Sequence, residues 1–525
     1  MPPNKQHSFI ILFFLLHVKN PSDNKGAHFH VLYERKAMAE AFEKNPLFPI
    51  ANPRSICFFG VSSSPFSMGT NLLISLRAMG FRGSIYPIHP QIKDIQGLRV
   101  YPSVMDVPQV PDLAVIVLAA PIVPQVLEEC GRKGIRHAII VSGGFKEVGE
   151  KGVLLEKRIL EIARRYGIRF LGPNCIGVIN PGHKLNTTLI SYTGAPGFIG
   201  MASQSGSFVT QMFGHLFRLR LGFSTAFSVG NEANVDLVDC LTYLGTCPNT
   251  KVIALYVEDI KRGREFTRTA KKIALQKPIV AYYVGGSETG KRAGFSHTGA
   301  MAGPDELYSG AFQQSGVIRA TSVIELFDFC WILGTMPPAI GPRVVIQTHS
   351  GGPGAAAADA CGRAGLELPE LSKETLEKLA PFLPPTGSAR NPIDFTYTKN
   401  PLDYFSKIPE VLIQEKNADM LLLYLLLPSQ ILKRNLEQMG LSEDQIREQA
   451  KQLVDTQSGY LINLQKQCKK PLIGYTFQST DEEYIQAVLD KGLPVLPDAV
   501  RAARALKALV RYTRWRQNTL KHSGT

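Results

Sequence analysis

The sequence lacks the cysteine patterns of disulfide-rich and metal-binding proteins. Its eight cysteines are scattered over 525 residues without a CxxC pair. In a large chain this spacing argues against a disulfide framework and predicts reduced, partly buried thiols in a cytoplasmic protein. Proline and glycine, at 35 and 46 residues, are too few to indicate disorder. The cysteines are Cys57, Cys130, Cys175, Cys240, Cys247, Cys330, Cys361 and Cys468.

Hydrophobic runs of membrane-spanning length are also absent. The apolar run Phe9–Leu16 is too short to cross a bilayer, and no small-residue cleavage site of a signal peptide follows it closely. Met38 begins a segment typical of a cytoplasmic start. We therefore interpret residues 1–45 as a disordered or mis-assigned N-terminal extension, in preference to a signal peptide.

The fingerprint of an NAD site is missing from the first strand–turn–helix segment. The turn FFGVSSSPFSMG has Gly60 and Gly69 with serines between them, where a dinucleotide site has GxGxxG. The second strand ends at Tyr86–Pro90 without the carboxylate that binds the ribose. Small hydroxyl residues at a helix N-terminus still form an anion cradle, so the turn suits a phosphorylated cofactor other than NAD. An ordinary turn between strand and helix is the alternative.

An ATP-binding module is missing too. The sequence contains no GxxxxGK[ST] and no extended glycine-rich hairpin with metal-binding acids. We therefore expect this chain to hold neither ATP nor a metal ion by itself.

The charge balance is basic, with a net charge of +14 and a pI near 9.3. A basic surface favours anionic partners, but nucleotides, CoA, carboxylates and nucleic acids all qualify. The tail Arg501–Lys521 contains seven Lys and Arg residues and no acid. Because this tail has helical spacing, a solvated basic face explains it better than nucleic-acid binding.

Short apolar runs alternate with helical patterns along most of the chain. This alternation predicts βαβ units with parallel sheets, and the continuous apolar strands predict helices on both faces of each sheet. The expected strands include Ser55–Val61, Ile85–Ile88, Leu113–Leu118, Ala138–Ser142, Phe198–Ala202, Ser224–Val229, Val252–Val257, Ile279–Val284, Val344–Gln347, Met420–Leu427 and Leu472–Phe477.

Two turn-rich breaks divide this pattern, at Ser191–Gly197 and at Gly334–Pro342. The polar, helix-prone stretch Ser429–Lys470 is predicted to be an inserted helical hairpin or lid. The breaks predict three successive α/β units over residues 46–190, 191–338 and 339–525.

Ten motifs in a fixed order resemble one protein family. They are GVSSSPFSMG, IYPIHPQIK, VIVLAAP, VSGGFKEVGEKG, FLGPNCIGVINP, MASQSGSF, SVGNEANVDLVD, FSHTGAMAG, THSGGPGAAAADA and NPIDF. Over residues 50–512 the chain resembles the alpha subunit of ADP-forming acetyl-CoA synthetases and, more distantly, that of succinyl-CoA synthetase. The resemblance implies a Rossmann-like CoA-binding domain followed by two flavodoxin-like ligase domains.

The resemblance also implies where CoA binds. Relatives often carry a lysine near the position of Phe66–Met68, and this chain does not. The implied CoA contacts are Gly60, Ser62, Ser63, Ser64, Pro90, Lys93, Ser142 and Gly143.

A phosphorylated histidine is implied at His297, in the motif GFSHTGAMAG. A histidine in a loop is most often a plain surface residue, but flanking glycines and two preceding basic residues suit a mobile phosphate carrier. The family's histidine-orienting carboxylate falls on Glu258, at the end of VIALYVE. A carboxylate on one ring nitrogen fixes the tautomer and leaves the other nitrogen free to attack phosphorus.

Two strand–turn–helix segments, in the motifs MASQSGSF and THSGGPGAAAADA, are expected to bind the phosphoryl group. Each offers free N–H groups at a helix N-terminus, and together they would clamp phosphate from two sides. Asn391 and Asp394 of NPIDF are weaker candidates for the same phosphate site. Glu232 and Asp236 are expected to organise a helix start, and contact with the substrate is the alternative. The implied phosphate residues are Asn174, Ser205, Gly206, Gly351, Gly352 and Gly354.

The resemblance implies an acid–thiol ligase that interconverts acid, CoA and ATP with acyl-CoA, ADP and phosphate. ATP or ADP and Mg²⁺ would be held by an ATP-grasp beta subunit, so a hetero-oligomer is expected, with a small carboxylic acid as substrate and no nucleic acid or membrane partner. A CoA-binding regulatory protein without catalysis is the alternative. The retained His297 and Glu258 argue against it.

The first prediction concerns the cofactor of the first unit. Residues 46–190 should bind CoA and not NAD, because the turn lacks GxGxxG and the second strand lacks its acid. Titration calorimetry with each cofactor measures this directly. Tighter binding of NAD than of CoA would contradict the prediction.

Overall fold

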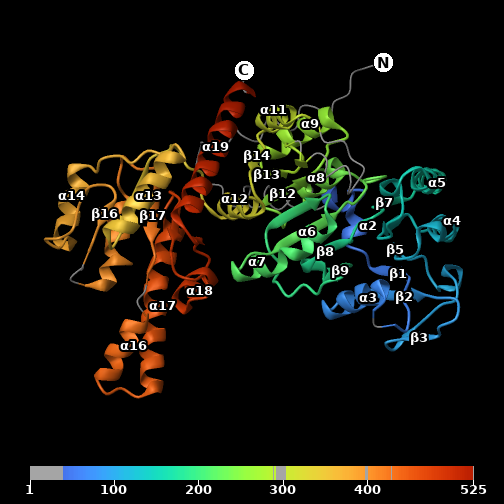
Figure 1. Cartoon of the computed structure of the whole chain (residues 1–525), viewed down its shortest axis with the longest axis horizontal. Helices are drawn as coiled ribbons and strands as arrows, with labels where there is room; N and C mark the ends of the chain where they lie inside the picture. Colours follow the sequence, from blue (N-terminus) through green and yellow to red (C-terminus); the bar gives the residue numbers. More distant parts are fainter. Residues whose placement is uncertain are drawn as a thin grey trace, which may run out of the picture.

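Three largely parallel sheets, one for each expected α/β unit, form the framework of the chain (Figure 1). The computed structural model describes residues 40–523 except 65, 288, 291–302, 397–399 and 427–428. Residues 1–39 of the N-terminal extension and His297 lie outside these residues, while residues 40–43 of the extension are helical. The α/β fold class predicted from the sequence is confirmed.

The first sheet consists of β1 (Ser55–Phe59), β2 (Ser84–Ile88), β5 (Leu113–Ile116), β6 (His137–Ile140) and β7 (Arg169–Leu171). Its helices are α2 (Phe48–Ala51), α3 (Met68–Ala78), α4 (Val123–Lys133) and α5 (Glu150–Tyr166). A short hairpin joins β3 (Asp94–Ile95) and β4 (Leu98–Arg99). The strands lie in the order β2-β1-β5-β6-β7 and are all parallel, so the turns after them meet at one edge.

The second sheet consists of β8 (Val178–Asn180), β9 (Leu185–Asn186), β10 (Ile199–Ser203), β11 (Phe223–Ser228), β12 (Val252–Val257), β13 (Ile279–Tyr283) and β14 (Ile318–Ala320). Its helices are α6 (Gly206–Gln211), α7 (Phe213–Arg218), α8 (Leu237–Thr246), α9 (Gly263–Ala274), α11 (Asp305–Ser315) and α12 (Val323–Thr335). β8 pairs antiparallel with β11 although it precedes the predicted boundary at residue 190. The exact domain boundaries therefore stay a prediction.

The third sheet consists of β15 (Val344–Thr348), β16 (Ile393–Asp394), β17 (Met420–Tyr424), β18 (Leu472–Tyr475) and β19 (Val495–Leu496). Its helices are α13 (Gly351–Arg363), α14 (Lys373–Leu379), α15 (Lys407–Ile413), α16 (Ser429–Gln438), α17 (Glu443–Gln467), α18 (Glu483–Asp490) and α19 (Ala499–Ser523). The predicted helical hairpin is confirmed as α16 and α17, which extend away from the sheet in Figure 1.

Helices α12 and α19 join the second and third units. Arg501 of α19 donates two hydrogen bonds of 2.7 Å to the carboxylate of Asp328 on α12. One turn further, Arg504 pairs with Glu325 at 2.7 Å, and the Tyr512 hydroxyl donates to the Ala274 carbonyl at 2.8 Å. Part of the basic tail thus has acidic partners inside the chain.

The predicted state of the cysteines is confirmed. All eight are free, and all but Cys468 are buried. None of the helices in the described part of the chain combines the length and the hydropathy that a bilayer crossing requires.

The joint between α12 and α19 generates a stability prediction. The Asp328 side chain is only 2% exposed, and burial raises its pKa although Arg501 opposes this. Arg501→Met should lower the free energy of unfolding by about 3–5 kcal/mol, because it leaves a buried carboxylate without its partner. The chain's two tryptophans, Trp331 and Trp515, lie on these helices, so urea unfolding followed by their fluorescence measures the loss.

The matched control is Arg363→Met, which breaks the exposed pair with Asp359. An exposed pair contributes about 0–1 kcal/mol, so this variant should unfold almost like the wild type. Equal urea midpoints for the two variants would contradict the assigned role of Arg501.

Candidate functional site

The turn after β1 brings a helix N-terminus close to the strand edge. Gly60 has a φ of +94°, and a Cβ there would lie 2.0 Å from the Val117 carbonyl oxygen. A Cβ on Gly69 would lie 2.2 Å from the Gly60 oxygen. Both positions therefore require glycine, since a side chain at Gly60 would collide with Val117 and one at Gly69 would push α3 away from the turn.

Serine and threonine hydroxyls shape the same turn. The Ser62 N–H donates to Thr70 Oγ1 at 3.1 Å, and Thr70 Oγ1 donates back to the Ser62 oxygen at 2.9 Å. Ser63 and Ser64 are exposed, and Ser67 precedes α3 without a side-chain cap. The turn thus presents hydroxyl groups and a helix N-terminus to solvent, as an anion cradle requires.

The other predicted CoA residues lie at the same edge of the first sheet. Ser142 follows β6, is buried, and accepts a hydrogen bond of 3.1 Å from the Leu118 N–H after β5. Gly143 is exposed beside it, and Pro90 and Lys93 are exposed after β2. Ligands of open α/β sheets bind at the carboxyl edge, so these positions suit one cofactor. Their individual contacts with CoA stay predictions.

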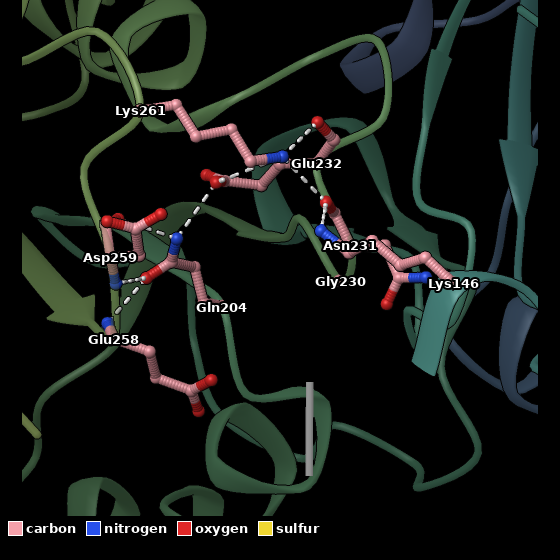
Figure 2. Close-up of a pocket in the computed structure, with 8 residues that line it drawn as sticks. All are labelled: Lys146, Gln204, Gly230, Asn231, Glu232, Glu258, Asp259 and Lys261. Atoms are coloured by element: carbon pink, nitrogen blue, oxygen red, sulfur yellow. Dashed lines mark hydrogen bonds and ion pairs between the residues drawn. The ribbon is translucent and has the colours of Figure 1, made fainter. Parts of the chain in front are cut away.

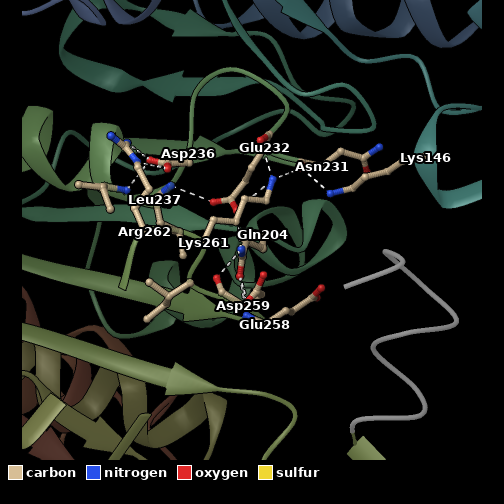
Figure 3. Close-up of polar contacts among 12 residues, drawn as sticks. Lys146, Gln204, Asn231, Glu232, Asp236, Leu237, Glu258, Asp259, Lys261 and Arg262 are labelled. Atoms are coloured by element: carbon tan, nitrogen blue, oxygen red, sulfur yellow. Dashed lines mark hydrogen bonds and ion pairs between the residues drawn. The ribbon is translucent and has the colours of Figure 1, made fainter. Parts of the chain in front are cut away.

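Asn231, in the turn after β11, connects the first unit to the second (Figure 3). Its carboxamide donates to Glu147 at 2.6 Å and to Glu156 at 3.1 Å, both in the first unit. Its backbone carbonyl accepts from Lys146 at 2.8 Å and from Lys261 at 2.9 Å. One residue thereby fixes charged groups from three separate segments.

Gln204, at the end of β10, connects separate segments inside the second unit through hydrogen bonds of its side chain. Its carbonyl oxygen accepts from the backbone N–H groups of Glu258 at 2.5 Å and Asp259 at 3.0 Å. Its NH₂ group donates to the Asp259 oxygen and to the Glu232 carboxylate, each at 2.8 Å. The backbone that carries Glu258 is therefore held by a buried side chain.

Glu232 is a buried carboxylate with an elevated pKa. It has a φ of +52°, and its Oε1 accepts from the Leu237 N–H at 2.8 Å. Burial raises its pKa to about 7, although Lys261 at 4.0 Å and the Gln204 hydrogen bond oppose the rise. Burial lowers the pKa of Lys261, and the nearby Lys146 charge adds to this effect.

The predicted helix start is confirmed at Asp236. Asp236 caps α8, and with Asp239 it forms a capping box in which each side chain accepts from the backbone of the other residue. Arg262 pairs with both acids. The Glu232 bond to Leu237 supports the same turn.

These side chains surround a small pocket between the first two units, shown in Figure 2. The two ammonium groups lie together beside Asn231, and Glu258 projects from the opposite side. The sequence predicted a role for Glu258 and offered Glu232 as an alternative substrate contact. It did not single out the other lining side chains, although the motifs SGGFKEV, SQSG and SVGNE contain several of them. The lining residues are Lys146, Gln204, Gly230, Asn231, Glu232, Glu258, Asp259 and Lys261.

Part of the predicted phosphate site lies next to this pocket. Asn174 has a φ of +59°, and its NH₂ group donates to Asn231 Oδ1 at 3.3 Å. Ser205 is the N-cap of α6, and a side chain at Gly206 would meet Ile176 and Ser228. Asn174 is thus joined to the pocket through Asn231, while phosphate binding by these residues stays a prediction.

The glycines of α13 lie elsewhere in the chain. A Cβ on Gly351 would lie 3.6 Å from Asp394 Oδ2, one on Gly354 would lie 2.8 Å from Thr348 Cγ2, and Gly352 is open. Asn391 instead caps the third sheet, because its side chain bonds the backbone of Ile346 and Val344. Figure 1 shows α13 and α6 on opposite sides of α19. The described chain does not bring the two helix N-termini to one point.

Three family models match consecutive parts of the chain. The CoA binding domain matches residues 54–181, the succinyl-CoA ligase like flavodoxin domain matches 196–333, and the ligase-CoA domain matches 344–428. Fold, pocket and matches together define an α/β ligase with a CoA-binding unit.

Comparison with similar proteins shows to which family of ligases the chain belongs. The alpha subunit of acetate–CoA ligase (ADP-forming) I from Pyrococcus furiosus is 37% identical over 89% of this chain and 97% of its own. The dinucleotide-forming acetyl-coenzyme A synthetase 1 of Candidatus Korarchaeum cryptofilum, solved in complex with phosphate and ADP, superposes with a TM-score of 0.79 at 32% identity, covering 91% of this chain and 99% of that one. The chain belongs to the family of ADP-forming acyl-CoA ligases.

Some relatives are longer than this chain. Acetate–CoA ligase (ADP-forming) I of Archaeoglobus fulgidus is 36% identical over 88% of this chain, which spans 63% of that relative. Acetate–CoA ligase (ADP-forming) of Methanocaldococcus jannaschii is 41% identical, and the match covers 48% of it.

The pKa of Glu232 generates a pH prediction. Its value of about 7 in the folded chain exceeds the ordinary 4.5, so the protonated carboxyl stabilises the fold below pH 4.5 and this contribution disappears as the pH rises through 7. Relative to the wild type, Glu232→Gln should therefore gain about 3 kcal/mol in unfolding free energy between pH 4.5 and pH 8.

Urea unfolding at a series of pH values gives this difference, independently of any constant loss from the altered hydrogen bonds. Glu306→Gln, on the exposed first turn of α11, is the control and should follow the wild type at every pH. A constant difference between Glu232→Gln and the wild type would refute the assigned titration.

Proposed function

We propose that this chain is the CoA-binding, histidine-carrying half of an acid–thiol ligase that works through a phosphohistidine. The observation that supports this most is the position of Glu258, which projects into a pocket whose other side is formed by the loop after β6. That loop carries Ser142 and Gly143, the predicted CoA contacts. The predicted histidine-orienting acid and the sheet edge that carries the predicted CoA contacts thus face one small pocket.

The reaction consists of three balanced transfers. A nitrogen of His297 attacks the terminal phosphorus of ATP, and ADP leaves. An oxygen of the acid then attacks the phosphorus, which forms an acyl phosphate and frees the histidine. The CoA sulfur, having lost its proton, attacks the acyl carbon, and phosphate leaves as the thioester forms. Glu258 would hold one ring nitrogen so that the other stays nucleophilic.

The nucleotide-binding part is proposed to lie in a partner. The chain contains no GxxxxGK[ST] segment, the Pyrococcus relative is named as an alpha subunit, and the Archaeoglobus relative extends beyond the matched region. An ATP-grasp beta subunit that holds ATP or ADP with Mg²⁺ would complete the enzyme. His297 would then carry phosphate between the two sites, which is a task for a loop and not for a rigid helix.

A CoA-binding regulator without catalysis is not favoured, because the curated relatives of similar sequence are named as ligases. The helix N-termini at Ser205 and at Gly351 remain proposed phosphate sites. Since one chain does not bring them together, they would bind the phosphoryl group at separate stages or from separate chains.

Phosphate labelling tests the phosphohistidine. Acyl-CoA and ³²P-phosphate, given to the complex of this chain with its ATP-grasp partner, should place an acid-labile, base-stable label on His297. His297→Asn should abolish the label and turnover. Glu258→Gln should keep the fold and lower labelling, because a charge-assisted hydrogen bond becomes a neutral one of about half the strength.

His522→Asn, at the exposed end of α19, is the control and should label normally. A His297→Asn protein that still makes acyl-CoA at a rate near the wild type would rule out the phosphohistidine route.

A further inference from the structure

Glu147 lies in the loop that follows β6, which also carries the predicted CoA contacts Ser142 and Gly143. One oxygen of its carboxylate, Oε1, accepts hydrogen bonds from two successive backbone N–H groups of the same loop. These are the N–H groups of Gly144, at 2.6 Å, and of Phe145, at 3.1 Å. The side chain of Glu147 therefore turns back onto its own loop and binds the backbone there.

The second carboxylate oxygen reaches the other unit. Glu147 Oε2 accepts a hydrogen bond of 2.6 Å from the side chain of Asn231, in the turn after β11. Asn231 is buried, and its NH₂ group also donates to Glu156 on α5 at 3.1 Å. One carboxylate thus connects the loop with the predicted CoA contacts to the second unit.

These hydrogen bonds keep Glu147 ionised. Burial raises its pKa, but the bonds from Asn231 and from the loop N–H groups outweigh burial, so the pKa lies below its ordinary value. Hydrogen bonds to an ionised acceptor are roughly twice as strong as those to a neutral one. The three bonds of Glu147 are therefore charge-assisted.

The other contacts of the loop leave Gly143 against Glu147. Phe145 is fully buried, and the Ser142 backbone oxygen accepts from the Asn174 N–H at 2.9 Å. A Cβ on Gly143 would lie 3.4 Å from Glu147 Oε1. The exposed glycine, a predicted CoA contact, thus lies between two positions whose backbone is bound and beside the carboxylate that binds one of them.

We propose that Glu147 is a positioning residue for CoA, which holds the loop after β6 in the conformation that binds the cofactor and makes this conformation depend on Asn231. The inference rests on the part of the proposed function that places CoA at Ser142 and Gly143. Glu147 acts through the loop backbone and not by touching CoA. A substitution in the second unit should therefore weaken a cofactor that binds to the first.

Titration calorimetry of the full chain with CoA tests this. Glu147→Gln should raise the Kd for CoA by about 3- to 10-fold, because the bonds to the loop become neutral ones of about half the strength and the amide no longer accepts from Asn231. Asn231→Ala should raise the Kd to a similar extent, although it keeps the backbone oxygen that binds Lys146 and Lys261.

Steady-state kinetics separate this role from a general loss of structure. In the complex with the ATP-grasp partner, and with acetate as the acid, Glu147→Gln should raise the KM for CoA by the same factor as the Kd. The KM for acetate and kcat should change little, whereas a damaged fold would alter all three values.

Glu150→Gln is the matched control, because it removes the same charge from the exposed first turn of α5, and it should bind CoA like the wild type. A Glu147→Gln protein with the CoA affinity of this control overturns the proposal. Tighter binding of CoA also overturns it, because the carboxylate would then obstruct the loop. Should Glu147→Gln not fold, Asn231→Ala decides alone.

The same measurements separate this inference from the phosphohistidine mechanism. A wild type that binds CoA, loses affinity in Glu147→Gln as expected, and takes no label on His297 would overturn the phosphohistidine and leave the role of Glu147 standing. A wild type that does not bind CoA would overturn both.

Discussion

The carboxamide of Asn231 joins the CoA-binding unit to the second unit beside the pocket, and the arrangement of the site depends on it. Its NH₂ group bonds Glu147 and Glu156, and its backbone oxygen accepts from Lys146 and Lys261. Lys146, Glu147 and Glu156 are half-buried, and Lys261 keeps part of its side chain exposed, so these bonds mainly hold the charged groups in position. The network therefore fixes how the sheet edge with the predicted CoA contacts faces the pocket. It thereby also fixes where phosphate could attack a bound thioester.

Gln204 extends this network to the loop that carries Glu258. One buried carboxamide binds two backbone N–H groups, a backbone oxygen and the Glu232 carboxylate. Fully satisfied polar networks hold their members in one arrangement, whereas a partly satisfied network would cost stability. A carboxylate that must orient a moving histidine gains from such support, because its own backbone then stays in place during transfer.

Much of the fold could be predicted from local sequence patterns. Features that depend on pairing between segments distant in sequence could not. The strand Val252–Val257 was predicted with its observed bounds, because apolar runs and turn residues are local signals. The helical insertion over residues 429–470 was predicted for the same reason. The antiparallel pairing of β8 with the second sheet was not predicted, since nothing local distinguishes the sheet that a short strand joins. Asn231 and Gln204 were likewise recognised only as parts of motifs, because their function depends on partners distant in sequence.

The central claim is that the first two units present CoA and the phosphoryl carrier to one pocket. A structure of the complex with its ATP-grasp partner, determined with a bound acyl-CoA, tests it most directly. The account predicts CoA phosphates at the turn after Gly60 and the thioester carbon in the pocket between Lys146 and Glu258. A thioester bound away from that pocket, with the CoA phosphates still at the Gly60 turn, would contradict it.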